Sequence, residues 1–416
     1  MRSSEIYPAP PTVADQELWE EKEVSTEQSS LEVGENKDLA LQQTQDAFGN
    51  EEFAEVKYKV LKWWQCGLLM VAETVSLGVL SLPAAVAGLG LVPSVIILVC
   101  LGGLATYTGY VIGQFKWRYP HVCNMADAGE VLAGRFGREL LGFAQIIFLI
   151  FIMASHLLTF TIAMNALTDH GTCSIVFGVV GLVVSFACSL PRTLEKMSWL
   201  SLISGHAAFF SLAAELKNPA DYPKALMLLQ SVDMTLYLVA AVVIYCYGGS
   251  TVTSPALGSA STVVSKVAYG IALPTIIIAG VINGHVSAKS VYVRIFRGTD
   301  HMHKRTWTAV GSWTAIVLTL WVLAWIIAEA IPVFNKLLSL VTALFASWFT
   351  FGLSAIFWFY MNSGRWFSSP KKFALSAVNL LALAVGCCLC GLGLYVSGKA
   401  IHDDPHHASF TCMSTV

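Results

Sequence analysis

Hydrophobic residues fill most of the chain in long stretches that short polar loops interrupt. Each stretch approaches the roughly 20 residues that a helix needs to cross a bilayer, and therefore predicts a transmembrane helix. Such spans are expected at residues 63–90, 92–115, 140–168, 173–190, 197–214, 233–249, 263–288, 307–331, 337–360 and 374–398. The pattern predicts an all-α polytopic membrane protein.

Composition supports this fold class and divides the chain. Charged residues make up only 12% of it, against roughly 25% in an ordinary soluble domain. Residues 1–56 hold 14 acidic and three basic residues, a net charge of −11, whereas the remainder has a net charge of +9. An acidic segment with little apolar surface cannot offset its chain entropy by burial. We therefore expect a disordered acidic cytoplasmic tail at 1–56. A solvated leader is the favoured interpretation of this tail, and a regulatory element is the alternative. A membrane domain at 57–400 and a short extracytoplasmic tail at 401–416 are expected to follow.

The first span carries polar and helix-breaking residues at membrane depth. A carboxylate, three hydroxyls, a glycine and a proline lie between Glu73 and Pro83. Backbone polar groups in hydrocarbon must be satisfied internally, so such a helix unwinds only where the freed groups line a site. An interrupted helix that binds a ligand is therefore predicted here. The alternative is a kinked structural helix whose Ser and Thr side chains bond to their own backbone.

Charge in the loops predicts the orientation of the spans. Basic residues gather in the loops at 116–138, 190–197, 289–305 and 361–372, which are therefore assigned to the cytoplasm. The loops at 190–197 and 215–224 both resemble cytoplasmic loops, yet a single apolar stretch, 197–214, lies between them. One crossing cannot return to its starting side. We interpret 197–214 as a re-entrant or half-length hairpin, or else the chain lacks part of two helices near Ser204-Gly205.

Several separated sequence blocks are similar to one protein family. They are Glu55–Lys59, Trp63-Trp64, Glu73–Pro83, Glu215–Pro219, Ala279–His285 and Ile295–His301. With these blocks the chain resembles fungal neutral amino-acid permeases of the amino acid/auxin permease family, from about residue 50 to the end. The resemblance implies a leucine-transporter-like inverted repeat whose first and sixth helices are broken. Against that pattern, the chain lacks parts of helices five and six around Ser204.

The resemblance implies a secondary active transporter of neutral aliphatic or aromatic amino acids, proton-coupled and working by alternating access. A helix that restarts near Leu80 would offer backbone N–H groups to the substrate carboxylate, and Gly78 would allow close approach. Hydroxyls and unwound carbonyls would bind the remaining polar atoms. The expected substrate-binding residues are Thr74, Val75, Ser76, Leu77, Gly78, Gly205 and His206.

Coupling and cavity residues are expected elsewhere in the membrane. Glu73 is the only acid of the first span and a candidate for the transported proton, although a hydrated position near the cytoplasm remains an alternative. Asn283, His285 and Ser287 form a second polar group with the same candidate role. A lone histidine near a helix end is more often satisfied by a carbonyl or by water. Ser155 and His156 are expected to face the cavity.

Other classes of function are disfavoured. Seven of the ten cysteines fall in apolar segments and are interpreted as small hydrophobes, so no disulfide framework and no metal site are expected. Since no nucleophile and base occur at a recognisable spacing, an enzyme is not predicted. The expected partners are a neutral amino acid and the bilayer, without nucleic acid or any cofactor beyond the proton. The oligomeric state is left open, and the plasma membrane is favoured over the vacuolar membrane. The rival prediction is a non-transporting truncated isoform, or a membrane sensor or interaction protein on a permease scaffold.

Overall fold

The chain divides into two compact units, residues 1–50 and 51–416. The computed structural model describes residues 59–192, 209–252, 254, 256–296, 299, 301, 304, 306–331, 333–403, 410 and 412. All of these belong to the second unit. The predicted acidic tail at 1–56 therefore lies outside the described residues.

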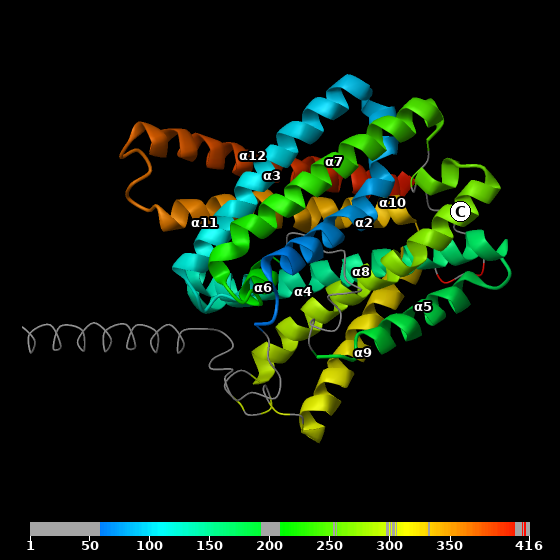
Figure 1. Ribbon diagram of the computed structural model, residues 1–416, viewed down its shortest axis with the longest axis horizontal. Helices are drawn as coiled ribbons and strands as arrows, with labels where there is room; N and C mark the ends of the chain where they lie inside the picture. Colours follow the sequence, from blue (N-terminus) through cyan, green and yellow to red (C-terminus); the bar gives the residue numbers. More distant parts are fainter. Residues whose placement is uncertain are drawn as a thin grey trace, which may run out of the picture. The chain divides into compact units, whose positions relative to one another are not determined.

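All regular elements of the described residues are helices (Figure 1). The α-helices are α2 (Trp63–Leu89), α3 (Leu91–Arg118), α4 (Met125–Thr168), α5 (Ser174–Cys188), α6 (Phe209–Ala214), α7 (Tyr222–Gly248), α8 (Thr262–Phe296), α9 (Trp307–Ala330), α10 (Phe334–Val341), α11 (Leu353–Met361) and α12 (Pro370–Asp403). Short 3₁₀ turns are η2 (Pro219–Asp221), η3 (Gly249–Thr251) and η4 (Ala256–Ser259), and η6 (Thr342–Ala346) and η7 (Trp348–Gly352) are π-helical. Seven described helices are long and apolar enough to cross a membrane. The prediction of an all-helical polytopic membrane protein is confirmed.

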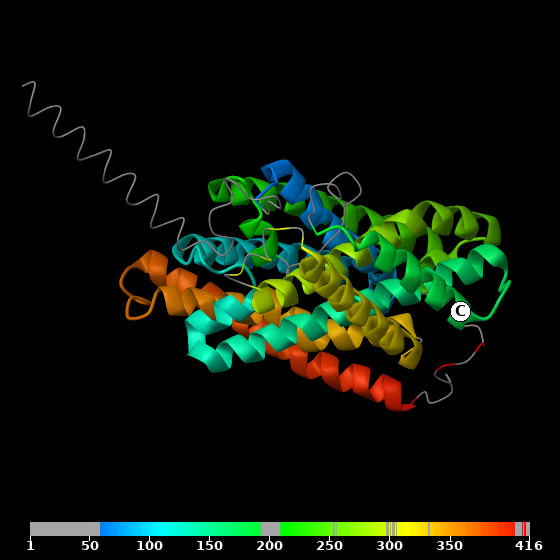
Figure 2. The same cartoon turned by 90° about the horizontal axis from the view of Figure 1, so that it is seen from below.

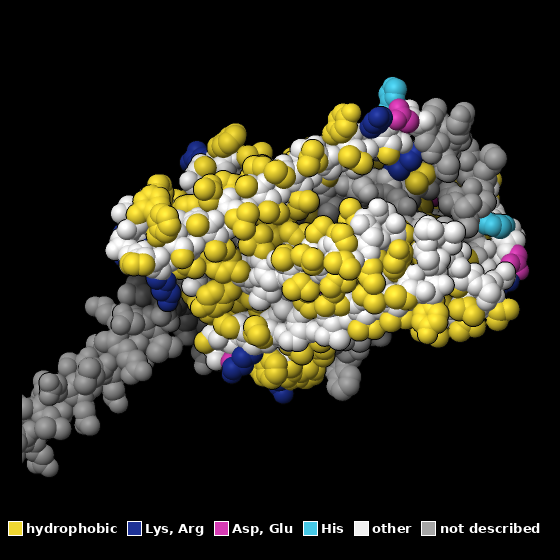
Figure 3. All heavy atoms as spheres, turned by 90° about the horizontal axis from the view of Figure 1, so that it is seen from above, with side chains coloured by type: hydrophobic (Ala, Val, Ile, Leu, Met, Phe, Trp, Pro, Cys, Tyr) yellow, Lys and Arg dark blue, Asp and Glu magenta, His cyan; other side chains and the backbone are white. Residues whose placement is uncertain are grey.

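The helices differ in how much of their apolar surface other helices cover. In α4, 78% of the most apolar stretch is buried, against 22% in α3, α7 and α12. α4 packs against α5, α8, α9 and α10, in the bundle that Figure 2 shows from below. Hydrophobic side chains spread across the face seen in Figure 3, and charged ones lie at its margins. A protein in lipid has this arrangement, since exposed apolar side chains there face hydrocarbon rather than water.

Loops rich in basic residues meet at one end of the bundle, which we call the inner end. Arg192 donates hydrogen bonds to the Tyr292 hydroxyl and to the carbonyls of His301 and Lys304. Arg118 donates to the carbonyl of Met361 at 3.0 Å. Other connections join the opposite end, the outer end, where Lys266 pairs with Asp169 and the backbone N–H of Phe410 donates to the carbonyl of Glu329. The four loops that the sequence assigns to one side of the membrane therefore lie at one end of the structure.

The segment between α5 and α7 starts and finishes at this inner end. Arg192 precedes residues 193–208, which lie outside the described part of the chain, and Glu215 follows α6. The backbone N–H of Leu61, just before α2, donates to the carbonyl of Glu215 at 3.0 Å. Trp117, at the end of α3, donates from its indole N–H to the carbonyl of Pro219 at 2.9 Å. Arg192 and Glu215, which flank this segment, therefore both lie at the inner end.

The interruption predicted between Glu73 and Pro83 is wrong for this structure, because α2 is one continuous 27-residue helix with Pro83 inside it. Packing accounts for the difference. The most extensive contact between any two described helices is that of α2 with α7. At Gly67 an added Cβ would lie 2.8 Å from a side-chain carbon of Leu228 and 3.0 Å from the carbonyl oxygen of Ala225. Tertiary contact of this extent overrides local helix propensity.

A disulfide bond joins Cys173 to Cys412, so the expectation of no structural disulfide is wrong. The two cysteines are 239 residues apart in sequence, and pairings over such distances cannot be deduced from spacing. Cys173 caps the start of α5, and Cys412 follows Phe410, whose ring lies 6.4 Å from that of Trp325 on α9. The bond thus fastens residues near the carboxyl terminus to the outer end.

Candidate functional site

Two neighbouring chambers lie beside α7. The first, of about 390 Å³, is formed by α3, α4, α7 and the two π-helical segments. The second, of about 530 Å³, extends towards α2, α10 and α12. The chambers share the lining residues Leu98, Tyr237, Thr342, Ala346, Thr350 and Phe351. We call the two together the membrane cavity.

Two polar residues of α7 line the first chamber. Gln230 and Asp233 are 8% and 5% exposed, and Asp233 lies near the middle of the helix. Asp233 is the only carboxylate among the described residues that line the membrane cavity. Its role was missed in the sequence because the predicted span starts at residue 233, which places the acid at the membrane boundary. The earlier start was signalled by Pro223, since proline is favoured in the first turn of a helix.

Another wall of the membrane cavity is π-helical. Residues of η6 and η7 line both chambers, and π-helical turns occur frequently at functional sites. Thr342 and Ser347 donate their hydroxyls to carbonyls four residues earlier, at 2.6 and 2.7 Å. From α12, Gly393 packs so tightly that an added Cβ would lie 2.6 Å from the Cβ of Ala343. Small residues thus hold α12 against the widened helix.

The predicted substrate residues of the first helix are placed only in part. The backbone of Thr74, Val75, Ser76, Leu77 and Gly78 is helical within α2, and the side chains of residues 72–78 lie outside the described set. The end of the same motif reaches the membrane cavity, since Ser81 and Leu82 line the second chamber. Gly205 and His206 lie in segment 193–208, outside the described residues. The side chain of Glu73, on α2, is likewise outside the described set.

The predicted residues of α4 and α8 are buried, but they do not line the membrane cavity. Ser155, His156, Asn283, His285 and Ser287 are each at most 4% exposed. Two of them bond within their own helices, where Ser155 donates to the carbonyl of Phe151 and Asn283 to that of Ala279.

Close packing surrounds the two histidines. An added Cβ on Gly280 would lie 3.1 Å from the Cβ of His156, so α4 and α8 are in tight contact there. The ring of His285 lies 5.1 Å from that of Trp313. In this conformation the α4 and α8 polar residues form part of a packed interface between α4, α8 and α9.

A buried ion pair lies at the inner end. Lys289 Nζ lies 2.8 Å from a carboxylate oxygen of Glu215, and the two side chains are 6% and 2% exposed. Lys289 belongs to α8, whereas Glu215 follows α6 and is bonded through its carbonyl to the start of α2. The pair therefore joins three parts of the membrane domain. The sequence block Glu215–Pro219 signalled its importance, but no partner could be assigned without the fold.

Comparison with known proteins gives consistent matches. Residues 59–205 and 204–398 match the family described as transmembrane amino acid transporter protein. The N amino acid transport system protein of Neurospora crassa is 33% identical, and the match covers 84% of this chain and 87% of the relative. A transmembrane transporter of Fusarium pseudograminearum is 29% identical over 77% of this chain and 79% of the relative. A transmembrane transporter of Gibberella moniliformis is also 29% identical, over 78% of this chain and 81% of the relative.

These matches bear on the segment around Ser204. The family match comes in two parts that meet at residues 204–205. The Neurospora comparison runs over 409 positions but covers 84% of a 416-residue chain, about 350 residues, so roughly 60 positions lack a counterpart here. Ser204-Gly205 is also the point at which parts of two helices are expected to be missing.

Proposed function

Because the chain belongs to the transmembrane amino acid transporter protein family, we propose that it carries neutral amino acids through the membrane cavity, coupled to protons. It is an integral multi-pass membrane protein of amino acid transport and not an enzyme. The finer proposal concerns the substrate class, the coupling ion and the residues involved.

The lining of the membrane cavity supports an aliphatic or aromatic substrate. Leu98, Met234 and Phe349 provide apolar surface for a hydrophobic side chain. The substrate ammonium would meet Gln230 and Asp233, and the hydroxyl of Thr350 on the π-helical wall would donate to its carboxylate. An apolar pocket with a few polar groups is the usual form of a small-molecule site.

Asp233 carries the proposal. A carboxylate within a membrane span is a candidate for proton transfer by default, and this one lies both at mid-helix and in the membrane cavity. We propose that Asp233 takes up and releases the transported proton as the cavity opens alternately to each side. Glu73, Asn283, His285 and Ser287 remain predicted coupling residues. Thr74 to Gly78, with Gly205 and His206, remain predicted substrate residues.

Uptake into proteoliposomes tests this proposal. Labelled leucine uptake should rise when a pH gradient is imposed, and Asp233→Asn should lower it about tenfold or more, the equivalent of one hydrogen bond to a charged group. Asp221→Asn is the matched control, because Asp221 lies at the start of the same helix and pairs with the exposed Lys224. Uptake in the wild type that ignores the gradient would refute proton coupling.

A non-transporting form is the second candidate, favoured by the division of the family match at residues 204–205 and by the roughly 60 aligned positions that lack a counterpart in this chain. A chain with the corresponding segment of the Neurospora relative inserted there provides the comparison. Uptake only after insertion would support an inactive form, whereas equal uptake would support a shortened carrier. The plasma membrane remains the proposed location, which a fluorescent fusion imaged beside a vacuolar marker would test.

A further inference from the structure

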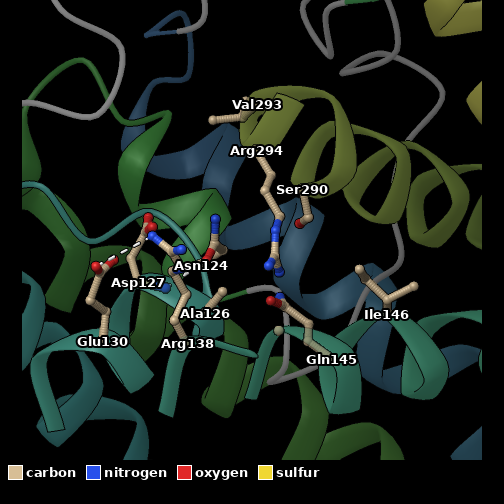
Figure 4. A pocket seen from close by; sticks show the side chains of 11 residues that line it. Asn124, Ala126, Asp127, Glu130, Arg138, Gln145, Ile146, Ser290, Val293 and Arg294 are labelled. Carbon is tan, nitrogen blue, oxygen red and sulfur yellow. Dashed lines mark hydrogen bonds and ion pairs between the residues drawn. The ribbon is translucent and has the colours of Figure 1, made fainter. Parts of the chain in front are cut away.

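A second cavity, of about 200 Å³, lies at the inner end and shares no lining residue with the membrane cavity (Figure 4). The start of α4, a later part of α4 and the end of α8 form its walls. The lining includes Asn124, Asp127, Glu130, Arg138, Gln145 and Arg294. We call it the inner cavity.

A reversal within α4 builds the inner cavity. Ala133 and Gly134 leave helical geometry, and Gly134 has a φ of 60°. The chain then folds back so closely that an added Cβ on Gly129 would lie 2.2 Å from the carbonyl oxygen of Gly137. The backbone N–H of Met125 donates to the side-chain oxygen of Gln145 at 3.0 Å, which fixes the base of this hairpin. The cavity is therefore held by packed backbone.

Charges of both signs surround the inner cavity. Figure 4 shows Arg138 directed towards Asp127 and Glu130, and Arg294 directed towards Gln145. Arg138 lies 3.4 Å from a carboxylate oxygen of Glu130, and Arg294 also pairs with Glu139. Gly142 leaves room for Arg294, since an added Cβ would lie 3.2 Å from its guanidinium.

We infer that the inner cavity binds a free amino acid, as a second site separate from the transport route. An isolated anion would meet the carboxylates, and an isolated cation would meet the guanidiniums. A zwitterion satisfies both, because its carboxylate can take a contact from the guanidinium nitrogen of Arg294 beside Gly142, the other nitrogen being paired with Glu139, while its ammonium lies near Asp127 and Glu130. The ligand class rests on the proposed function. The position implies that amino acid on the inner side of the membrane fills the site.

Protection of an introduced thiol tests this inference. Ser290 lines the inner cavity, so the full-length Ser290→Cys variant is treated with N-ethylmaleimide, and labelling at position 290 is followed by mass spectrometry. Leucine should slow labelling about fivefold or more, in the range of one charged hydrogen bond. Isopentylamine lacks the carboxylate and 4-methylpentanoate lacks the ammonium, so each should slow it less than about twofold. Equal protection by a one-charge analogue, or none by leucine, would overturn the inference and leave only an ion-pair network.

Variants of the arginines sharpen the test. Added to Ser290→Cys, Arg294→Gln should abolish protection, and Arg294→Lys should restore it in part, because lysine keeps the charge but loses the planar fork. Arg135→Gln is the matched control, since Arg135 is exposed on the same hairpin and does not line the cavity. Loss of protection in this control would indicate a general charge effect and refute the site.

The outcome is distinguishable from failure of the transport proposal. Leucine protection without uptake in proteoliposomes would support the inner site and reject the carrier. Uptake without leucine protection would support the carrier and reject the inner site. Labelling at position 290 reports only the inner cavity, and uptake reports only passage across the membrane.

Discussion

At the inner end, charged side chains hold the helices together, with Lys289 and Glu215 as a buried pair and Arg294 beside Glu139. At the outer end, a disulfide between Cys173 and Cys412 and a ring contact between Phe410 and Trp325 hold the chain together instead. Disulfides form in oxidising compartments, so the bond at the outer end agrees with the assignment of the basic loops at the inner end to the cytoplasm. Charge contacts can also exchange for water when helices separate, whereas a covalent bond cannot.

The largest effect is expected from breaking the buried pair at the inner end. Glu215→Gln would leave the Lys289 charge buried without its counterion, which costs about 3–5 kcal/mol. The double variant Glu215→Leu with Lys289→Met should recover most of this loss, because it removes both charges. Thermal unfolding in detergent, followed by tryptophan fluorescence, measures the change. A loss below about 1 kcal/mol in the single variant would mean that the pair is hydrated.

Removing the disulfide should weaken the outer end somewhat less. Cys412→Ser should cost about 2–4 kcal/mol, the usual range for a native disulfide. Cys100→Ser is the control, since Cys100 is an exposed free cysteine on α3. A reducing agent should lower the unfolding temperature of the wild type and leave that of Cys412→Ser unchanged. Equal responses would show that the bond does not support this end.

Two glycines of α2 compare the ends within one helix. Gly67→Ala, near the inner end, forces a methyl group against Leu228 and the carbonyl of Ala225 and should cost about 1–3 kcal/mol. Gly88→Ala, near the outer end, meets nothing within 4 Å and should stabilise the helix by about 0.5–1 kcal/mol. Unfolding temperatures of the two variants should therefore move in opposite directions. A shift in the same direction would indicate that α2 does not pack against α7 as described.

The sequence predicted the helices well because long apolar stretches have few alternatives in a membrane. It predicted the start of α7 poorly, since an aspartate inside a span resembles a boundary, and Asp233 was thereby missed. It also predicted an interruption in α2 that local propensity favours and that packing against α7 overrides. The failure of 197–214 to alternate pointed to the stretch in which the family match divides, because loop charge depends on topology and not on the details of packing.

Contacts between residues far apart in the chain could not be predicted from the sequence. The disulfide joins cysteines 239 positions apart, and the Lys289–Glu215 pair joins two segments that only the fold brings together. The distance between two residues along the sequence does not show whether they are in contact when no recognisable motif contains both of them. The inner cavity was missed for the same reason, because its arginines come from two helices and its shape depends on the reversal at Gly134.

The smallest effect is expected for the exposed ion pair at the outer end. Lys266 Nζ lies 2.6 Å from the carboxylate of Asp169, but the two side chains are 32% and 72% exposed. Water screens such pairs, so Asp169→Asn should cost about 0–1 kcal/mol, and the difference should shrink further in high salt. Asparagine is the suitable replacement because Asp169 has a φ of 51°, a left-handed conformation that asparagine tolerates. Asp169→Ala would add backbone strain to the loss of charge, so a larger effect for alanine than for asparagine separates the two causes. If Asp169→Asn cost as much as Glu215→Gln, charge would support both ends equally and the contrast between them would fail.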